Sequence, residues 1–180
     1  MNRGNTKFNP AVLSPQDLKS HAKEASQGSG GRHFLYPGQI FVSREAIKIS
    51  TILGSCAAVC LWDSRRKIGG MNHYLLPEGP ADGENRLRYG NVANAALLKE
   101  LLDMGSDVKD LQAKIFGGTS AYVADPLTAL GTRNVEMAEK FLRSVGIHVT
   151  AREVSGKYGR KLTFNTLDGA TEVMNYQGVS

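Results

Sequence analysis

Apolar and polar residues alternate along much of the chain, in runs of the length that β-strands have. The first such runs cover residues 33–43 and 46–53, and two largely apolar runs, 56–62 and 67–76, follow them, separated by a short polar stretch. Alternation with a period of two is typical of half-buried strands, and the short polar interruption favours a hairpin. Four further runs predict strands at residues 111–118, 147–154, 160–167 and 169–174.

Two segments change to the period of a helix. In residues 85–105 the apolar side chains lie mostly on one helical face, and Gly105 is a favourable end. A second helix is predicted over residues 134–145, with Asn134 as its N-cap and Gly146 as its end. The mixed order of strands and helices predicts an α/β (α+β) sandwich, in which mixed, largely antiparallel β-sheet layers are covered by two main helices.

The N-terminal segment differs in composition from the rest of the chain. Residues 1–30 end in SQGSGGR, and we expect them to form a flexible arm in which Ser14 caps a short helix. Residues 31–180 are expected to form a single domain, since 180 residues is an ordinary domain length.

Composition and charge exclude several classes of protein. The net charge is +5, but Lys and Arg are dispersed without an aromatic-interleaved basic stripe, so nucleic acid is not an expected partner. No run approaches the roughly 18 apolar residues of a membrane span, so we expect no membrane insertion and a cytoplasmic location. The two cysteines are too few for a disulfide framework or a Cys-only zinc site, and no metal is expected.

The candidate chemistry lies in the predicted hairpin, LGSCAAVCLWDSRRKIGGMNHYLLP, residues 53–77. A turn centred at residues 64–65 places Cys56 opposite His73, although a shift of one residue would move His73 to the other face. An imidazole beside a thiol can take its proton and so produce a nucleophile for an amide or ester carbonyl. Gly54 and Ser55 precede the thiol and provide N–H groups for an oxyanion.

Spacing alone leaves a structural interpretation of these residues open. A cysteine in an apolar strand is commonly a small core residue, and a histidine on a strand is commonly held by hydrogen bonds without further role. The core interpretation applies most strongly to Cys60, which lies between Val59 and Leu61.

Longer motifs favour the catalytic interpretation of Cys56 and His73 over the structural one. STILGSCAAVCLWD followed by GGMNHYLLP closely resembles the signature of the chemoreceptor glutamine deamidase (CheD) family, in which a His follows the Cys of LGSC by 17 residues. RYGNVAN, AKIFGGTS, GTRNVEMAEKFL and GRKLTFNTLDG follow in the family's order, so the resemblance covers about residues 33–174. It implies an α/β sandwich enzyme of chemotaxis that hydrolyses glutamine side chains on methyl-accepting receptors, without metal or organic cofactor. It implies the receptors as substrates and, for some members, a CheC-type phosphatase as partner.

The resemblance also implies residue roles, with Cys56 as nucleophile and His73 as general base. The family's third catalytic residue is a Thr six positions before the Cys, where this chain has Ser50, followed by Thr51. The role falls either to Ser50, which keeps the hydroxyl, or to Thr51 through a local shift, and Thr51 as an ordinary strand residue is the alternative. Two rival functions stay open: a thiol amidase or peptidase of other specificity, and a non-catalytic adaptor that docks a receptor or a CheC-type phosphatase.

Overall fold

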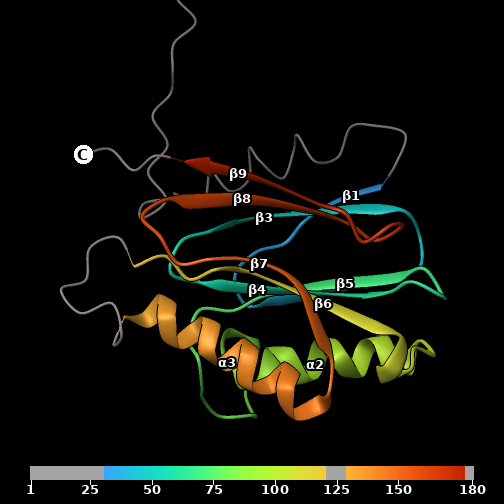
Figure 1. Cartoon of the computed structure of the whole chain (residues 1–180). Coiled ribbons are helices and arrows are strands. Elements are labelled where there is room, and N and C mark those ends of the chain that lie inside the picture. The colour runs from blue at the N-terminus through green and yellow to red at the C-terminus, as the bar shows by residue number, and fades with distance from the viewer. Residues whose placement is uncertain (1–30, 121–128, 177–180) are drawn as a thin grey trace, which may run out of the picture.

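The structure is a computed structural model that describes residues 31–120 and 129–176. The predicted arm, with its helix capped by Ser14, lies outside the described residues. The chain forms three layers: a four-stranded sheet, a five-stranded sheet below it, and a pair of helices below that (Figure 1).

The middle layer is the five-stranded sheet, in the order β2-β5-β4-β6-β7. Its strands are β2 (Gln39–Ser43), β4 (Ala57–Asp63), β5 (Ile68–His73), β6 (Leu111–Gly117) and β7 (His148–Val154). All neighbours in it are antiparallel except β6 and β7, which are parallel.

The outer sheet has the order β1-β3-β8-β9. Its strands are β1 (Gly31–Phe34), β3 (Ile47–Leu53), β8 (Gly159–Asn165) and β9 (Thr171–Tyr176). Only β1 and β3 are parallel, so the predicted class, a sandwich of mixed, largely antiparallel sheets with two main helices, is confirmed.

Both helices cover the same face of the five-stranded sheet (Figure 1). They are α2 (Gly90–Asp103) and α3 (Leu130–Val145), with short 3₁₀ turns η1 (Arg86–Arg88) and η2 (Val108–Asp110) before and after α2. None of the described helices is long and apolar enough to cross a membrane.

The predicted start of the second helix is wrong. α3 begins at Leu130 after an extended N-cap, Ala129, which makes no side-chain capping bond, so Asn134 lies within the helix. The rule that Asn caps helices misplaced the start because this helix begins without a polar cap. The predicted end is confirmed, since Gly146 takes the left-handed conformation with φ 75°.

The central strands of the middle sheet, β4 and β5, are buried on both faces, which explains the continuous apolar run of β4. Ala57, Val59 and Leu61 belong to the core beneath the helices, whereas Ala58 and Cys60 belong to the core between the sheets. Strands covered on both faces read as unbroken apolar runs because neither side chain direction meets water.

Gly69 and Gly70 in β5 permit this close packing. A Cβ on Gly69 would lie 2.9 Å from the Cα of Thr166, and one on Gly70 would lie 2.7 Å from Val42 Cγ2. Neither face of the strand therefore has room for a side chain at these two positions.

The register of the β4–β5 hairpin differs from the prediction. The turn occupies residues 64–67, and Ala57 pairs with Tyr74, which places Leu75 opposite Cys56. The predicted pairing of Cys56 with His73 is therefore wrong by two residues. Because a shift of two preserves the face of a strand, both side chains still belong to the face toward the outer sheet.

Candidate active site

His73, the last residue of β5, is buried and hydrogen-bonded across the two sheets. Its Nδ1 lies 2.8 Å from Oγ1 of Thr51, and the same hydroxyl donates to the carbonyl of Leu35 at 2.7 Å. A hydroxyl has a single hydrogen, so Thr51 must accept from Nδ1–H. Nε2 is then the unprotonated nitrogen, and it has no hydrogen-bond partner among the described residues.

Thr51 and Ser50 point to opposite faces of β3. Thr51 is fully buried toward the five-stranded sheet, whereas Ser50 lies on the other face, where its Oγ is 3.0 Å from Oγ1 of Thr163. Of the two hydroxyls that the sequence left open, the structure brings Thr51 to His73 and leaves Ser50 away from it.

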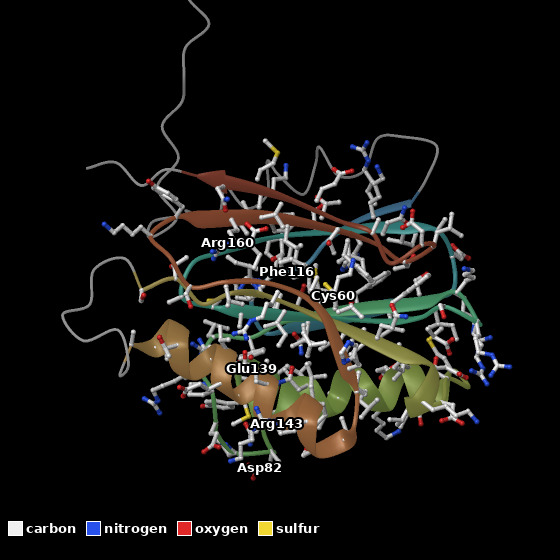
Figure 2. The ribbon with its side chains drawn as sticks, viewed as in Figure 1. Cys60, Asp82, Phe116, Glu139, Arg143 and Arg160 are labelled. Carbon is white, nitrogen blue, oxygen red and sulfur yellow. The ribbon has the colours of Figure 1, made fainter. Side chains whose placement is uncertain are left out.

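Cys56 stands immediately before β4, offset by two residues from the position opposite His73. Diagonal neighbours on one face of a sheet are about 7–8 Å apart at Cα, a distance that side chains can bridge. Cys56 is partly exposed, whereas Cys60 is buried between the sheets beside Phe116 (Figure 2). Only the first of the two thiols is therefore open to a partner.

Burial keeps both members of this pair neutral at pH 7. It raises the pKa of the Cys56 thiol to about 11, against the smaller opposing effect of its own backbone N–H. It lowers the pKa of His73 to about 4, opposed by the carbonyl of Leu35. At pH 7 both groups are thus neutral, a thiol and an unprotonated imidazole, and they do not form an ion pair.

The loop that carries Cys56 is fixed through three successive carbonyl groups. Those of Gly54 and Cys56 accept from the backbone N–H groups of Thr119 and Gly118, at 3.0 and 2.8 Å. That of Ser55 accepts from Nδ2 of Asn134 at 2.9 Å. Space stays open over Gly54, where a Cβ would meet no atom of the described chain within 4 Å.

The loop after β6 is itself pressed against the start of α3. A Cβ on Gly118 would lie 2.7 Å from the carbonyl oxygen of Gly131, so these two backbones touch directly. Arg160 supports the loop from the outer sheet, with Nη1 donating to the carbonyl of Gly117 at 3.2 Å and Nη2 to that of Ser155 (Figure 2).

Two residues that support the Cys56 loop and the loop after β6 are not predicted as functional from the sequence. The sequence predicts Asn134 only as a helix cap, and it predicts Arg160 only as the first residue of a strand. The Gly117–Thr119 loop was the one available signal, because a glycine pair after a strand indicates close approach of another backbone.

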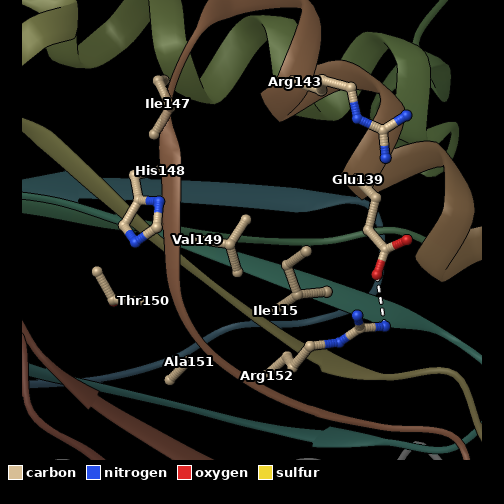
Figure 3. Close-up of a pocket in the computed structure, with 9 residues that line it drawn as sticks. All are labelled: Ile115, Glu139, Arg143, Ile147, His148, Val149, Thr150, Ala151 and Arg152. Carbon is tan, nitrogen blue, oxygen red and sulfur yellow. Dashed lines mark ion pairs between the residues drawn. The ribbon is translucent and has the colours of Figure 1, made fainter.

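A cavity of about 640 Å³ lies elsewhere, between α3 and the edge strand β7 (Figure 3). Its lining includes Arg143, His148 and an ion pair between Glu139 and Arg152. None of its lining residues is among the candidate catalytic residues. Within the described ranges, no three His, Cys, Asp or Glu side chains group so as to hold a metal ion.

The family model and the sequence relatives that match this chain are all CheD proteins. A family model described as CheD chemotactic sensory transduction matches residues 75–175. The probable chemoreceptor glutamine deamidase CheD of Trichlorobacter lovleyi is 40% identical over 139 residues, covering 77% of this chain and 86% of its own. That of Rhodospirillum rubrum is 41% identical over 145 residues, covering 80% and 82%. The corresponding CheD 1 of Anaeromyxobacter dehalogenans is 41% identical over 160 residues, covering 87% and 93%.

A solved structure is similar only in part. The hypothetical protein YfiH of Bacillus licheniformis aligns with 77% of this chain and 68% of its own, at 11% identity and a TM-score of 0.48. The sequence relatives carry the assignment instead. The chain belongs to the CheD family.

Proposed function

We propose that this protein hydrolyses the side-chain amide of glutamine residues on methyl-accepting chemoreceptors, in the cytoplasm, giving glutamate and ammonia. The observation that carries the proposal is the bond between Thr51 Oγ1 and His73 Nδ1, because it leaves Nε2 as a base on the face that also bears Cys56. The names of the relatives, probable chemoreceptor glutamine deamidases, supply the substrate.

In the first half of the proposed reaction, Sγ of Cys56 attacks the amide carbon while His73 Nε2 takes the thiol proton. A C–S bond forms and the amide oxygen becomes an oxyanion. His73 then returns the proton to the amide nitrogen, the C–N bond breaks, and ammonia leaves a thioester.

In the second half, His73 removes a proton from water as the hydroxide attacks the thioester carbon. The C–S bond breaks and the sulfur recovers its proton from His73, so that one glutamine and one water become glutamate and ammonia. The N–H groups of Ser55 and Cys56 are the proposed oxyanion donors in both halves, with Gly54 leaving room for the substrate.

The pKa values favour a general-base mechanism. A thiol with a pKa of about 11 and an imidazole with a pKa of about 4 do not form an ion pair in the resting enzyme. Proton transfer to His73 therefore accompanies attack on the amide in the proposed reaction, without a preformed thiolate.

The positive charge of the chain supports a protein substrate. A net charge of +5 favours approach to an acidic receptor surface. A CheC-type phosphatase is a further proposed partner, which follows from the family resemblance alone.

Mass spectrometry of a receptor cytoplasmic fragment tests the proposal. Incubation with wild type should raise the mass by about 1 Da at defined glutamines, because a carboxylic acid is about 1 Da heavier than the amide it replaces, and Cys56→Ala should abolish the gain. Cys60→Ala is the matched control, since Cys60 is the other thiol but is buried in the core, and it should retain activity.

The rival functions give different results in the same assay. Release of ammonia from free glutamine, with the receptor unchanged, would indicate a small-molecule amidase. If folded wild type converts no glutamine, and wild type and Cys56→Ala bind the receptor or the phosphatase equally well, the result would support the adaptor function.

A further inference from the structure

Asn134 connects the nucleophile loop to the segment that follows His73 and β5. Its Nδ2 donates two hydrogen bonds of 2.9 Å, one to the carbonyl of Ser55 and the other to that of Leu75. The residue is fully buried, and the hydroxyl of Tyr74 donates to its backbone carbonyl. A single amide thus links α3 to both segments of the site.

The orientation of this amide is decided by its surroundings. Reversing it would place Oδ1 against two carbonyl oxygens, which repel an acceptor. In the observed orientation Oδ1 accepts no hydrogen bond from the described residues, so the two donated bonds are what hold the side chain.

The bond to Ser55 fixes the direction of the next N–H group. Ser55 C=O and Cys56 N–H belong to one planar trans peptide unit, in which the two groups point in opposite directions. With the carbonyl held toward α3, the Cys56 N–H points away from the helix. This N–H and the attacking sulfur belong to the same residue, and the N–H acts to lower the pKa of the thiol.

We propose that Asn134 is a positioning residue for the oxyanion site, acting through the Ser55–Cys56 peptide unit. This inference rests on the proposed function, because it assigns the Cys56 N–H to the oxyanion of glutamine hydrolysis. Without the amide, the peptide unit can rotate and the N–H loses its direction. Asn134 itself does not touch the substrate.

Kinetics of Asn134→Ala test the role. Since the oxyanion forms only during reaction, kcat on the receptor fragment should fall about 10- to 100-fold while KM changes less than about threefold. Alkylation of Cys56 by iodoacetamide forms no oxyanion, so its rate should stay within about threefold of wild type. Asn134→Ser, which retains one donor on a shorter side chain, gives a second variant should the alanine variant fail to fold.

Asn94 is the matched control. It is a buried asparagine on the other helix, α2, and its Oδ1 accepts from Asn72 Nδ2 at 2.7 Å. Asn94→Ala should lose stability like Asn134→Ala but keep kcat within about threefold of wild type. An equal fall in kcat for both variants, or no fall for Asn134→Ala, overturns the inference.

The wild-type protein gives a readout that needs no variant. Both Nδ2 protons of Asn134 should exchange slowly with solvent in an NMR experiment, because both are bonded and buried. Fast exchange of either proton overturns the inference. A wild type that converts no receptor glutamine would instead overturn the proposed function, whatever the state of this amide.

Discussion

At the scale of single residues, the side chain of Thr51 defines the chemistry of His73. A neutral imidazole has one protonated nitrogen, and whichever group holds that proton decides which nitrogen is free. Thr51 Oγ1 can accept from Nδ1 because its own hydrogen is committed to Leu35. The hydroxyl of Thr51 thus selects the tautomer of His73. From the sequence alone, Thr51 looks like any other β-branched strand residue.

Substitution of the two neighbouring hydroxyls should separate their roles. Thr51→Ala removes the acceptor of Nδ1–H, so we expect deamidation to fall by at least about tenfold, and Thr51→Ser to restore part of the loss. Ser50→Ala should stay within about threefold, since the Ser50 hydroxyl bonds to Thr163 on the face of β3 away from His73. Initial rates of glutamine conversion on the receptor fragment measure both.

The opposite order of activity losses would assign the role of third catalytic residue to Ser50. A greater loss in Ser50→Ala than in Thr51→Ala would contradict the geometry and favour the position six residues before the cysteine. Thermal melts of each variant exclude unfolding as the cause.

At the scale of elements, the turn between β4 and β5 sets the register of the site. Asp63 closes it: Oδ1 accepts from the backbone N–H groups of Arg65 and Arg66, both at 3.0 Å, while Oδ2 is 3.1 Å from Arg66 Nη1. Burial acts to raise the pKa of this carboxyl, but the hydrogen bonds outweigh it and hold the pKa below its ordinary value. The carboxylate is therefore ionised and acts as a fixed acceptor in the turn.

Loss of this acceptor should destabilise the fold measurably. Asp63→Ala leaves turn N–H groups without their acceptor, and we expect a loss of about 2 kcal/mol or more in the free energy of unfolding, measured by urea titration. Asp168→Ala removes a similar bond, to Ala170 N–H, in an exposed turn, and should cost less than about 1 kcal/mol. Equal losses in the two variants would contradict a special role for the buried turn.

The sequence predicted the elements better than their alignment. The hairpin was recognisable because two apolar runs flank a polar stretch, but the turn lies at residues 64–67, one residue later than the polar stretch 63–66, and this moved the pairing by two positions. Cys56 and His73 kept a common face because the period of a strand is two. The choice between Ser50 and Thr51 needed tertiary contacts, since a one-residue difference selects the other face.

At the scale of the whole molecule, burying His73 between layers makes the fold sensitive to acid. Its pKa falls from 6.5 to about 4 on folding. The unfolded chain therefore takes up a proton below pH 6.5 that the folded chain does not accept until about pH 4. Stability from this residue is complete above pH 6.5 and is lost as the pH falls toward 4, by about 3 kcal/mol.

Urea titrations at pH 7.5 and 4.5 check this dependence. Wild type should lose more stability between the two values than His73→Asn, which keeps a donor for Thr51 but cannot titrate, by about 2 to 3 kcal/mol. Other acid-titrating groups affect both proteins alike. Equal losses would show that His73 is not the group responsible.

The layered architecture was predictable because each layer leaves its own pattern. The unbroken apolar run of β4 marks the centre of the middle sheet, and helical period marks the covering helices. The contact between Gly118 and Gly131, which joins the third layer to the nucleophile loop, had no such pattern, because it is made by backbone without side chains.

The open space over Gly54 determines which residues position 54 can accept. The fold gives this position no steric reason to be glycine, as a methyl group there would touch nothing in the described chain. Under the proposed function, this clearance is where the receptor would approach Cys56, so a larger residue at position 54 should hinder the receptor without disturbing the fold. The size of the residue that position 54 tolerates would therefore measure how closely the enzyme and the receptor approach each other at this point.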